Sequence, residues 1–250
     1  MIGEETVAHY VQHGSRESLR ACFKRLMTAD HALVESAIRK LCDRWLSPPH
    51  SHASIPADPL ESELRHVFSL VHPFYPRDVG CLSLFLLNYV KLAPGQAIFL
   101  KANEPHSYLS GDCVECMSQS DNVIRAGFTP KFKDVDQLVR SLSYECLPVS
   151  SLVQKPRPLP DGITCAYTCP VKDFAVDRIH FDCDGALCRR FVLPARESAS
   201  LMIVIRGHFT VPGLGVKAES GSVFLIPAML AVTLVSCETE LLCFRAFAHL

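Results

Sequence analysis

The sequence lacks an excess of either charge and lacks any long apolar run. Its 250 residues include 25 Lys and Arg against 26 Asp and Glu, with a formal net charge of −1 and no basic run. A basic patch is the electrostatic footprint of nucleic-acid or anionic-membrane binding, so neither class of partner is expected. The most apolar stretch, residues 79–92, contains Asn88 and Lys91 and is too short to span a membrane. We therefore expect a small molecule or another protein as partner.

The N-terminus also lacks the features of a targeting segment, because residues 1–6 are acidic and polar. A cytoplasmic location is the resulting expectation. Twelve cysteines with irregular spacing favour free thiols in a reducing compartment. The alternative is a four-cysteine zinc site from Cys113, Cys116, Cys165 and Cys169. The second pair has the wrong spacing for such a site, and the usual knuckle glycines are absent.

The first third of the sequence predicts helices. Apolar residues recur at helical spacing over residues 19–27, 34–45 and 60–71, behind candidate N-caps at Ser15, Asp30 and Asp58. Prolines between residues 47 and 56 predict a loop, which contains His50 and His52. Residues 84–92 are ambiguous between a buried helix and a strand.

From about residue 160 the sequence predicts a β-domain. Short β-rich runs alternate with Gly and Pro turns, which is typical of a sandwich or jelly roll. A separate strand is expected at residues 97–100. The β-rich runs are residues 174–181, 201–206, 208–211, 223–226, 231–235 and 241–248.

Residues 104–131 are unusually polar for a segment between two apolar runs. If Ser110 and Gly111 form a tight turn, the flanking residues pair so that His106 faces Glu115, with Tyr108 on the same side. A four-residue loop preserves this register and a three-residue loop breaks it. The imidazole is then either a metal ligand beside a proton-transferring carboxylate, or a structural histidine bonded to Glu115.

Arg125 follows a predicted turn at residues 120–122, which returns it toward the same side. A lone arginine is more typical of a surface ion pair. Composition and spacing alone thus predict a polar pocket in a β-domain.

The same segment resembles a known family signature. Residues 106–131 read H-S-Y-L-S-G-D-C-V-E-C-M-S-Q-S-D-N-V-I-R-A-G-F-T-P-K. This is similar to the type I mannose-6-phosphate isomerase pattern, and it departs from that pattern at Ser107 and Ser118, where serine replaces alanine. Residues 75–81, 87–88, 94–97, 173–174 and 241–246 extend the resemblance over nearly the whole chain.

The resemblance implies a mainly β fold with an N-terminal helical part. Residues 1–72 would belong to a helical insertion, residues 73–150 to the C-terminal half of a catalytic cupin-type jelly roll, and residues 151–250 to a second, C-terminal jelly roll. The first jelly roll would be incomplete.

The resemblance also implies a function, namely zinc-dependent interconversion of mannose 6-phosphate and fructose 6-phosphate by proton transfer through an enediol, feeding GDP-mannose synthesis. His106 matches a zinc ligand and Arg125 matches the catalytic arginine. Glu115, Tyr108 and Lys131 match residues that line the sugar pocket, and Glu115 is our candidate for moving the proton. The complete enzyme would hold one zinc ion and would be a monomer.

The sequence departs from the family in its metal ligands. The other three ligands come from Q-x-H-P and N-H-K-P-E motifs, and this sequence contains neither. Because one imidazole does not hold zinc, the chain alone is expected to be inactive. The alternative function is a non-catalytic module that binds a sugar phosphate or a protein. An unrelated cupin oxygenase is disfavoured, because it would need a second histidine-rich motif and residues around 223–227 supply none.

Overall fold

The computed structural model describes residues 1–46, 58–182, 189–236 and 238–248, which form two compact units. One, the helical unit, comprises Met1–Lys91, Leu100–Gly111 and Asp121–Leu152. The other, the sandwich unit, comprises Leu92–Phe99, Asp112–Ser120 and Val153–Leu250. The predicted boundaries at residues 72 and 150 stay a prediction, and His50 and His52 lie outside the described residues.

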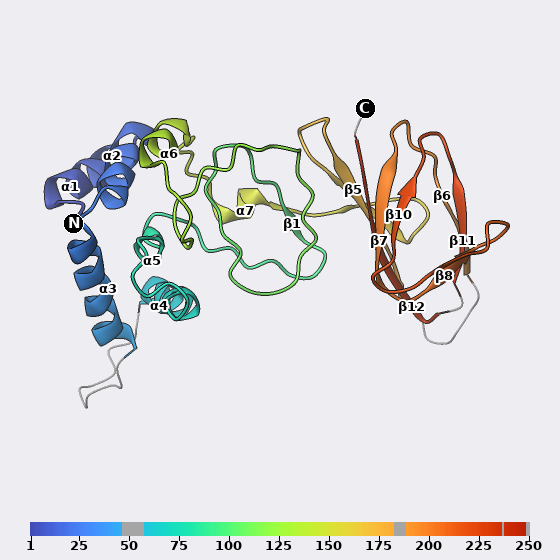
Figure 1. The fold of residues 1–250 in the computed structure, drawn as a ribbon, viewed down its shortest axis with the longest axis horizontal. Helices are drawn as coiled ribbons and strands as arrows, with labels where there is room; N and C mark the ends of the chain where they lie inside the picture. The colour runs from blue at the N-terminus through green and yellow to red at the C-terminus, as the bar shows by residue number, and fades with distance from the viewer. Residues whose placement is uncertain (47–57, 183–188, 237, 249–250) are drawn as a thin grey trace. The chain divides into compact units, whose positions relative to one another are not determined.

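The three predicted helices are confirmed together with their caps. The Ser15, Asp30 and Asp58 side chains accept hydrogen bonds from the backbone N–H groups of residues 18, 32 and 60, at 3.1, 2.8 and 3.3 Å. Such bonds satisfy donors that a helix start leaves unpaired. Among the described residues, no helix is long and apolar enough to cross a membrane. The helices, coloured from blue to yellow in Figure 1, are α1 (Glu4–His13), α2 (Arg16–Met27), α3 (His31–Trp45), α4 (Pro59–Val71), α5 (Gly80–Ser83), α6 (Val135–Ser141) and α7 (Val149–Leu152).

The core of the helical unit lies between α2, α3, α4 and α5. Trp45, 5% exposed, packs edge-on against Phe68 with ring centroids 5.5 Å apart, and its Nε1 donates to Glu61 Oε1 at 2.9 Å. Cys81 is fully buried in this core, and its burial raises the pKa of the thiol to about 12. Residues 84–92, ambiguous in the sequence, form neither a helix nor a strand.

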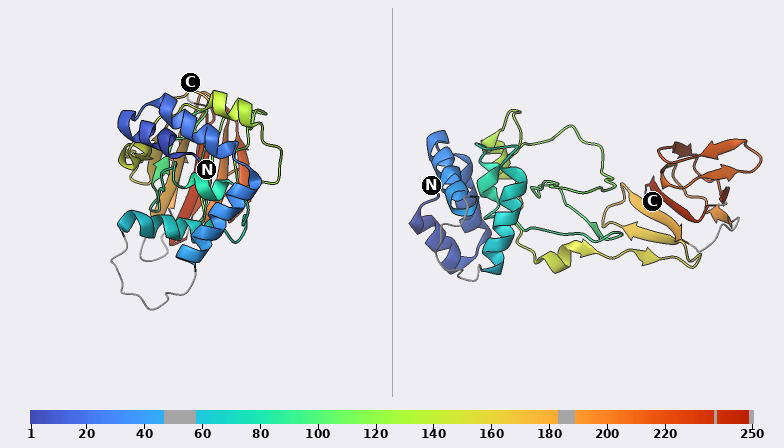
Figure 2. Two further views of the ribbon diagram at one scale, coloured as in Figure 1. Left: turned by 90° about the vertical axis from the view of Figure 1, so that its left-hand side faces the viewer. Right: turned by 90° about the horizontal axis from the view of Figure 1, so that it is seen from below.

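The sandwich unit contains two antiparallel sheets. The six-stranded sheet has the order β10-β7-β12-β5-β4-β3, and the four-stranded sheet the order β6-β11-β8-β9. Figure 2 shows these strands in yellow to red. Their bounds are β3 (Arg157–Pro158), β4 (Thr164–Thr168), β5 (Ala175–Asp182), β6 (Arg189–Leu193), β7 (Ser200–Arg206), β8 (Phe209–Val211), β9 (Val216–Ala218), β10 (Val223–Ile226), β11 (Val232–Ser236) and β12 (Glu240–Phe247). The short strands β1 (Ala97–Ile98) and β2 (Val153–Gln154) pair with each other.

Alternation along the central strands builds the sandwich core. Every second residue of β5 and β12 is buried, so one face of each strand lies in the interior and is apolar except at Asp177 and Arg245. These residues pack against buried residues of both sheets, including Met202, Phe209 and Leu234. Cys243 lies in this core, where burial raises its pKa to about 12. The fold class is therefore confirmed as mainly β with an N-terminal helical part, and all six predicted C-terminal runs form strands.

The sandwich also contains a buried charged network. Arg245 is fully buried; its Nε donates to Ser200 Oγ at 2.8 Å and its Nη1 to the Pro194 carbonyl at 2.7 Å. Nearby, Arg196 forms an ion pair with the buried Asp177. Burial raises the pKa of Asp177, and the positive charge of Arg196 offsets part of this rise. Since these groups are desolvated, removing any one of them is expected to be strongly destabilising.

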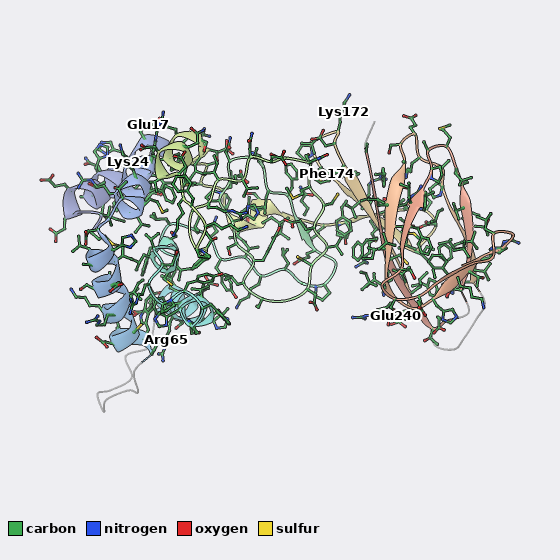
Figure 3. All side chains as sticks on the ribbon, in the orientation of Figure 1. Glu17, Lys24, Arg65, Lys172, Phe174 and Glu240 are labelled. Atoms are coloured by element: carbon green, nitrogen blue, oxygen red, sulfur yellow. The ribbon has the colours of Figure 1, made fainter. Side chains whose placement is uncertain are left out.

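Register fixes the two ends of the central ladder. Residues of β5 and β12 pair from Ala175 opposite Phe247 to Asp182 opposite Glu240. Phe174 and Glu240, both labelled in Figure 3, therefore mark opposite ends of this strand pair.

Candidate functional site

The segment from His106 to Lys131 contains no helix or strand. The chain bends at Ser110 and Gly111, and Gly111 adopts the positive φ of +100° that the predicted turn requires. The predicted pairing across this turn is wrong, because residues 104–109 and 112–119 form no ladder. An isolated two-stranded hairpin is marginal in water, and the described residues provide no third strand beside it.

His106 is held in an orientation that suits a metal ligand. Its Nδ1 lies 2.9 Å from the Glu104 carbonyl, which can only accept, so Nδ1 carries the proton and donates it. The lone pair is then on Nε2. Metal-ligating histidines commonly use the second nitrogen in this way, bonded to a backbone carbonyl. The ring is exposed, and the Tyr108 ring lies beside it with centroids 5.8 Å apart.

Arg125 and Lys131 belong to the same unit as His106. Arg125 is partly exposed and Lys131 is exposed. Neither forms an ion pair with any residue that the structure describes. Arg125 thus does not form, with any described residue, the surface ion pair that is typical of a lone arginine. Two cations without carboxylate partners, on one loop, are suited to bind an anionic ligand such as a phosphate ester.

Glu115 is exposed and belongs to the sandwich unit. The segment around it is fastened there, since Ser118 Oγ donates to Asp173 Oδ2 at 2.6 Å. Burial raises the pKa of Cys116, one residue beyond Glu115. The convergence of Glu115 with His106 stays a prediction, because the two residues lie in different units.

The residues present do not fit a zinc ion by themselves. Within the described ranges, no group of three or more His, Cys, Asp or Glu side chains could hold a metal ion. The nine cysteines that the structure describes are all free thiols. A catalytic zinc site needs three protein ligands plus an open position, so His106 alone is insufficient.

One functional element escaped the sequence analysis. Asp78 lies before α5, and its Oδ1 accepts from the backbone N–H groups of Gly80 and Phe128 at 2.7 and 3.0 Å. Its Oδ2 accepts from Lys133 Nζ at 2.7 Å. We call Asp78, Gly80, Phe128 and Lys133 the Asp78 clamp. An Asp two residues before a helical glycine signals a local turn, but the bonds to residues 128 and 133 leave no mark in the sequence.

Comparison with known proteins is consistent with this arrangement. Residues 1–87 match the family model "Phosphomannose isomerase type I, helical insertion domain". The chain is 42% identical to a probable mannose-6-phosphate isomerase of Echinococcus multilocularis, covering 93% of this chain and 58% of that protein. It is 36% identical to the mannose-6-phosphate isomerase of Bos taurus, covering 98% of this chain and 59% of that protein.

A solved structure shows the same likeness. The crystal structure of mannose 6-phosphate isomerase from Salmonella typhimurium, bound to fructose 6-phosphate and zinc, matches with a TM-score of 0.74 and 28% identity. That match covers 98% of this chain and 58% of the other. The chain thus spans less than two thirds of the length of the relatives it matches.

Proposed function

Because the chain is related over nearly its whole length to the type I phosphomannose isomerases, we propose that it forms the sugar-phosphate-facing part of a mannose-6-phosphate isomerase site. The observation that carries the proposal is the pair of cations at Arg125 and Lys131, which have no acidic partner among the described residues. Both lie in the segment that begins at His106.

The reaction moves one proton between neighbouring carbons of the open-chain sugar. Glu115 removes the proton from C2 of the aldose, the C–H electrons form the C1–C2 double bond, and negative charge develops on the carbonyl oxygen. The permanently charged Arg125 guanidinium stabilises that oxygen. A proton then passes from the C2 hydroxyl to the C1 oxygen, and Glu115 returns its proton to C1 as the C2 carbonyl forms, which gives the ketose. Lys131 and Tyr108 bind the phosphate and hydroxyl groups. In the reverse direction the same steps give mannose 6-phosphate, which would serve GDP-mannose synthesis.

The metal belongs to the complete site. The related structure holds zinc, and His106 is the single candidate ligand on this chain that we assign to it. Bound zinc would act as a Lewis acid on the sugar oxygens. The remaining ligands must come from a segment that contains the Q-x-H-P and N-H-K-P-E motifs. We therefore propose that this chain alone neither holds zinc nor turns over substrate.

Three measurements on the purified chain test the proposal: fructose 6-phosphate binding, zinc stoichiometry and a coupled isomerase assay. We expect fructose 6-phosphate to bind and unphosphorylated fructose not to bind, with no stoichiometric zinc and no turnover. Adding a segment with the missing motifs should restore both zinc and turnover. No binding of fructose 6-phosphate would overturn the proposal, and turnover by the chain alone would overturn the claim of an incomplete site.

A matched pair of variants identifies the anion site. Arg125→Ala should weaken fructose 6-phosphate binding about tenfold, as loss of a charge-assisted contact does. Arg65→Ala removes an exposed guanidinium from α4, labelled in Figure 3, and should leave binding unchanged.

A non-catalytic sugar-phosphate-binding module is the second candidate. The same two cations support it, together with the missing metal ligands. It predicts that fructose 6-phosphate binds but that no turnover appears, even after the segment with the missing ligands has been supplied.

A further inference from the structure

The loop that contains Arg125 and Lys131 is bonded to Asp78 at two points, one between the two cations and one after Lys131. Phe128 lies three residues after Arg125, and Lys133 lies two residues after Lys131. Both are bonded to the same carboxylate, since Asp78 accepts from the Phe128 N–H at 3.0 Å and from Lys133 Nζ at 2.7 Å. The Asp78 side chain is only 13% exposed, so these bonds are shielded from water.

Two glycines let the backbones meet at this point. A Cβ added to Gly127 would lie 2.8 Å from the Gly80 Cα and 3.0 Å from Asp78 Oδ1. A Cβ added to Gly80 would lie 2.9 Å from the Phe128 ring. Only glycine permits so close an approach. The contact fixes the distance between the start of α5 and the loop.

Phe128 itself is held in a conformation that a free loop would leave. Its φ is +54°, which is uncommon for a residue with a side chain. The N–H bond to Asp78 restrains its backbone, and its ring packs against Tyr75 with centroids 5.2 Å apart. A strained residue persists where its surroundings determine it from several sides.

We infer that Asp78 is a positioning residue, which fixes the loop so that Arg125 and Lys131 are presented to the phosphorylated ligand. This inference rests on the proposed function. Asp78 touches neither cation, and it acts through Phe128 and Lys133. Burial alone would raise the Asp78 pKa, but the bonds from Lys133, Gly80 and Phe128 outweigh it and lower the pKa. The carboxylate therefore stays ionised at neutral pH, as the clamp requires.

The first test measures the loop in the full chain, without any ligand. In Asp78→Ala, hydrogen exchange at the Phe128 amide should accelerate at least about tenfold, because its acceptor is gone. Native-state cleavage by trypsin after Arg125 and Lys131 should accelerate as well, while cleavage after Lys172 in the sandwich unit stays constant. Unchanged exchange and cleavage in a folded variant would overturn the inference.

Two further variants keep the test decisive where Asp78→Ala fails to fold. Lys133→Met retains both backbone bonds to Asp78. The rate of tryptic cleavage after Lys131 should therefore rise less in this variant than in Asp78→Ala. Glu61→Gln is the matched control, since Glu61 also joins a cation, Arg44 at 2.7 Å, within the helical unit. This control should not change cleavage of the loop. Equal effects of Glu61→Gln and Lys133→Met would overturn the inference.

The second test is binding. Asp78→Asn should weaken fructose 6-phosphate binding about tenfold, and Glu61→Gln should not. Loop loosening without any loss of affinity would overturn the positioning role. If the wild-type chain does not bind fructose 6-phosphate, the proposed function fails, and the exchange and cleavage results still decide whether Asp78 fixes the loop.

Discussion

Substituting Gly127 by alanine tests the close approach of the two backbone segments. Gly127 has no positive φ, so alanine is conformationally allowed and the effect is steric alone. The new methyl group would lie 2.8 Å from the Gly80 Cα, whereas carbon atoms pack at about 3.5–4.0 Å. The Gly80 Cα and N are backbone atoms that cannot rotate away, and the Asp78 Oδ1, 3.0 Å from the new methyl group, is held by its own hydrogen bonds. The segments must therefore separate by several tenths of an ångström, roughly 0.7 Å.

Overpacking of this kind lowers the free energy of unfolding by about 1–3 kcal/mol. With a urea m-value of about 1–3 kcal/mol/M, the unfolding midpoint should fall by on the order of 1 M. The assay is intrinsic fluorescence, because Trp45 is the sole tryptophan of the sequence and is buried in the helical unit. Its emission therefore follows the unfolding of that unit.

Gly14→Ala is the control for this experiment. Gly14 has a φ of +57° and no atom within 4 Å of an added Cβ. It should lose about 1 kcal/mol through backbone strain, with no change in trypsin cleavage after Arg125 or Lys131. Gly127→Ala should show both effects. A Gly127→Ala midpoint equal to that of the wild type, with unchanged cleavage, would refute the close-approach argument.

Three other expectations concern charge. The pKa of Asp78 is lowered by folding, so its contribution to stability is present above its unfolded pKa of about 3.9 and is lost as pH falls below that value. The urea midpoint followed by Trp45 fluorescence should therefore fall in this pH range, and the fall should be smaller in Asp78→Asn. Arg245→Ala leaves a buried hole among desolvated groups near Asp177, and should lower the free energy of unfolding of the sandwich unit by about 3–5 kcal/mol, measured by far-ultraviolet circular dichroism; a loss below about 1 kcal/mol would contradict the desolvation argument. Arg125→Ala, made in the complete enzyme, should lower kcat far more than zinc content; loss of zinc instead would place Arg125 among the residues that support the metal ligands.

Local signals predicted the helices α2, α3 and α4 and six strands of the sandwich unit, but not the helices α1, α5, α6 and α7. A cap such as Asp30 is bonded to the N–H two residues later, so the sequence window contains both partners. In β7, buried and more exposed residues alternate, and turns bound β10 on both sides. Both signals lie within a short stretch of sequence. The strands β2, β3, β4, β6 and β9 were not predicted. Two charged residues, Arg189 and Arg190, begin β6 and shorten its apolar run, and β9 has only three residues.

The site depends on contacts that no local window contains. The hairpin around Gly111 has a correct turn but no ladder, because ladder bonds depend on partners elsewhere in the chain. Asp78 accepts a hydrogen bond from Phe128, fifty residues later in the chain, and neither residue type predicts the other. The signature from His106 to Lys131 predicted which segment carries the candidate site. The structure adds that Arg125 has no ion-pair partner among the described residues.

Cys81 and Cys243 each provide a buried thiol whose reactivity reports the opening of the unit that contains it. One thiol is buried in the helical core and the other in the sandwich core, and each has a pKa of about 12. Because the thiolate is the reactive form, an alkylating reagent at neutral pH modifies these positions only when the surrounding core opens. The exposed thiols of Cys113 and Cys146 would react first and can be blocked beforehand. The rates at residues 81 and 243 would then show whether the two cores open together or one at a time.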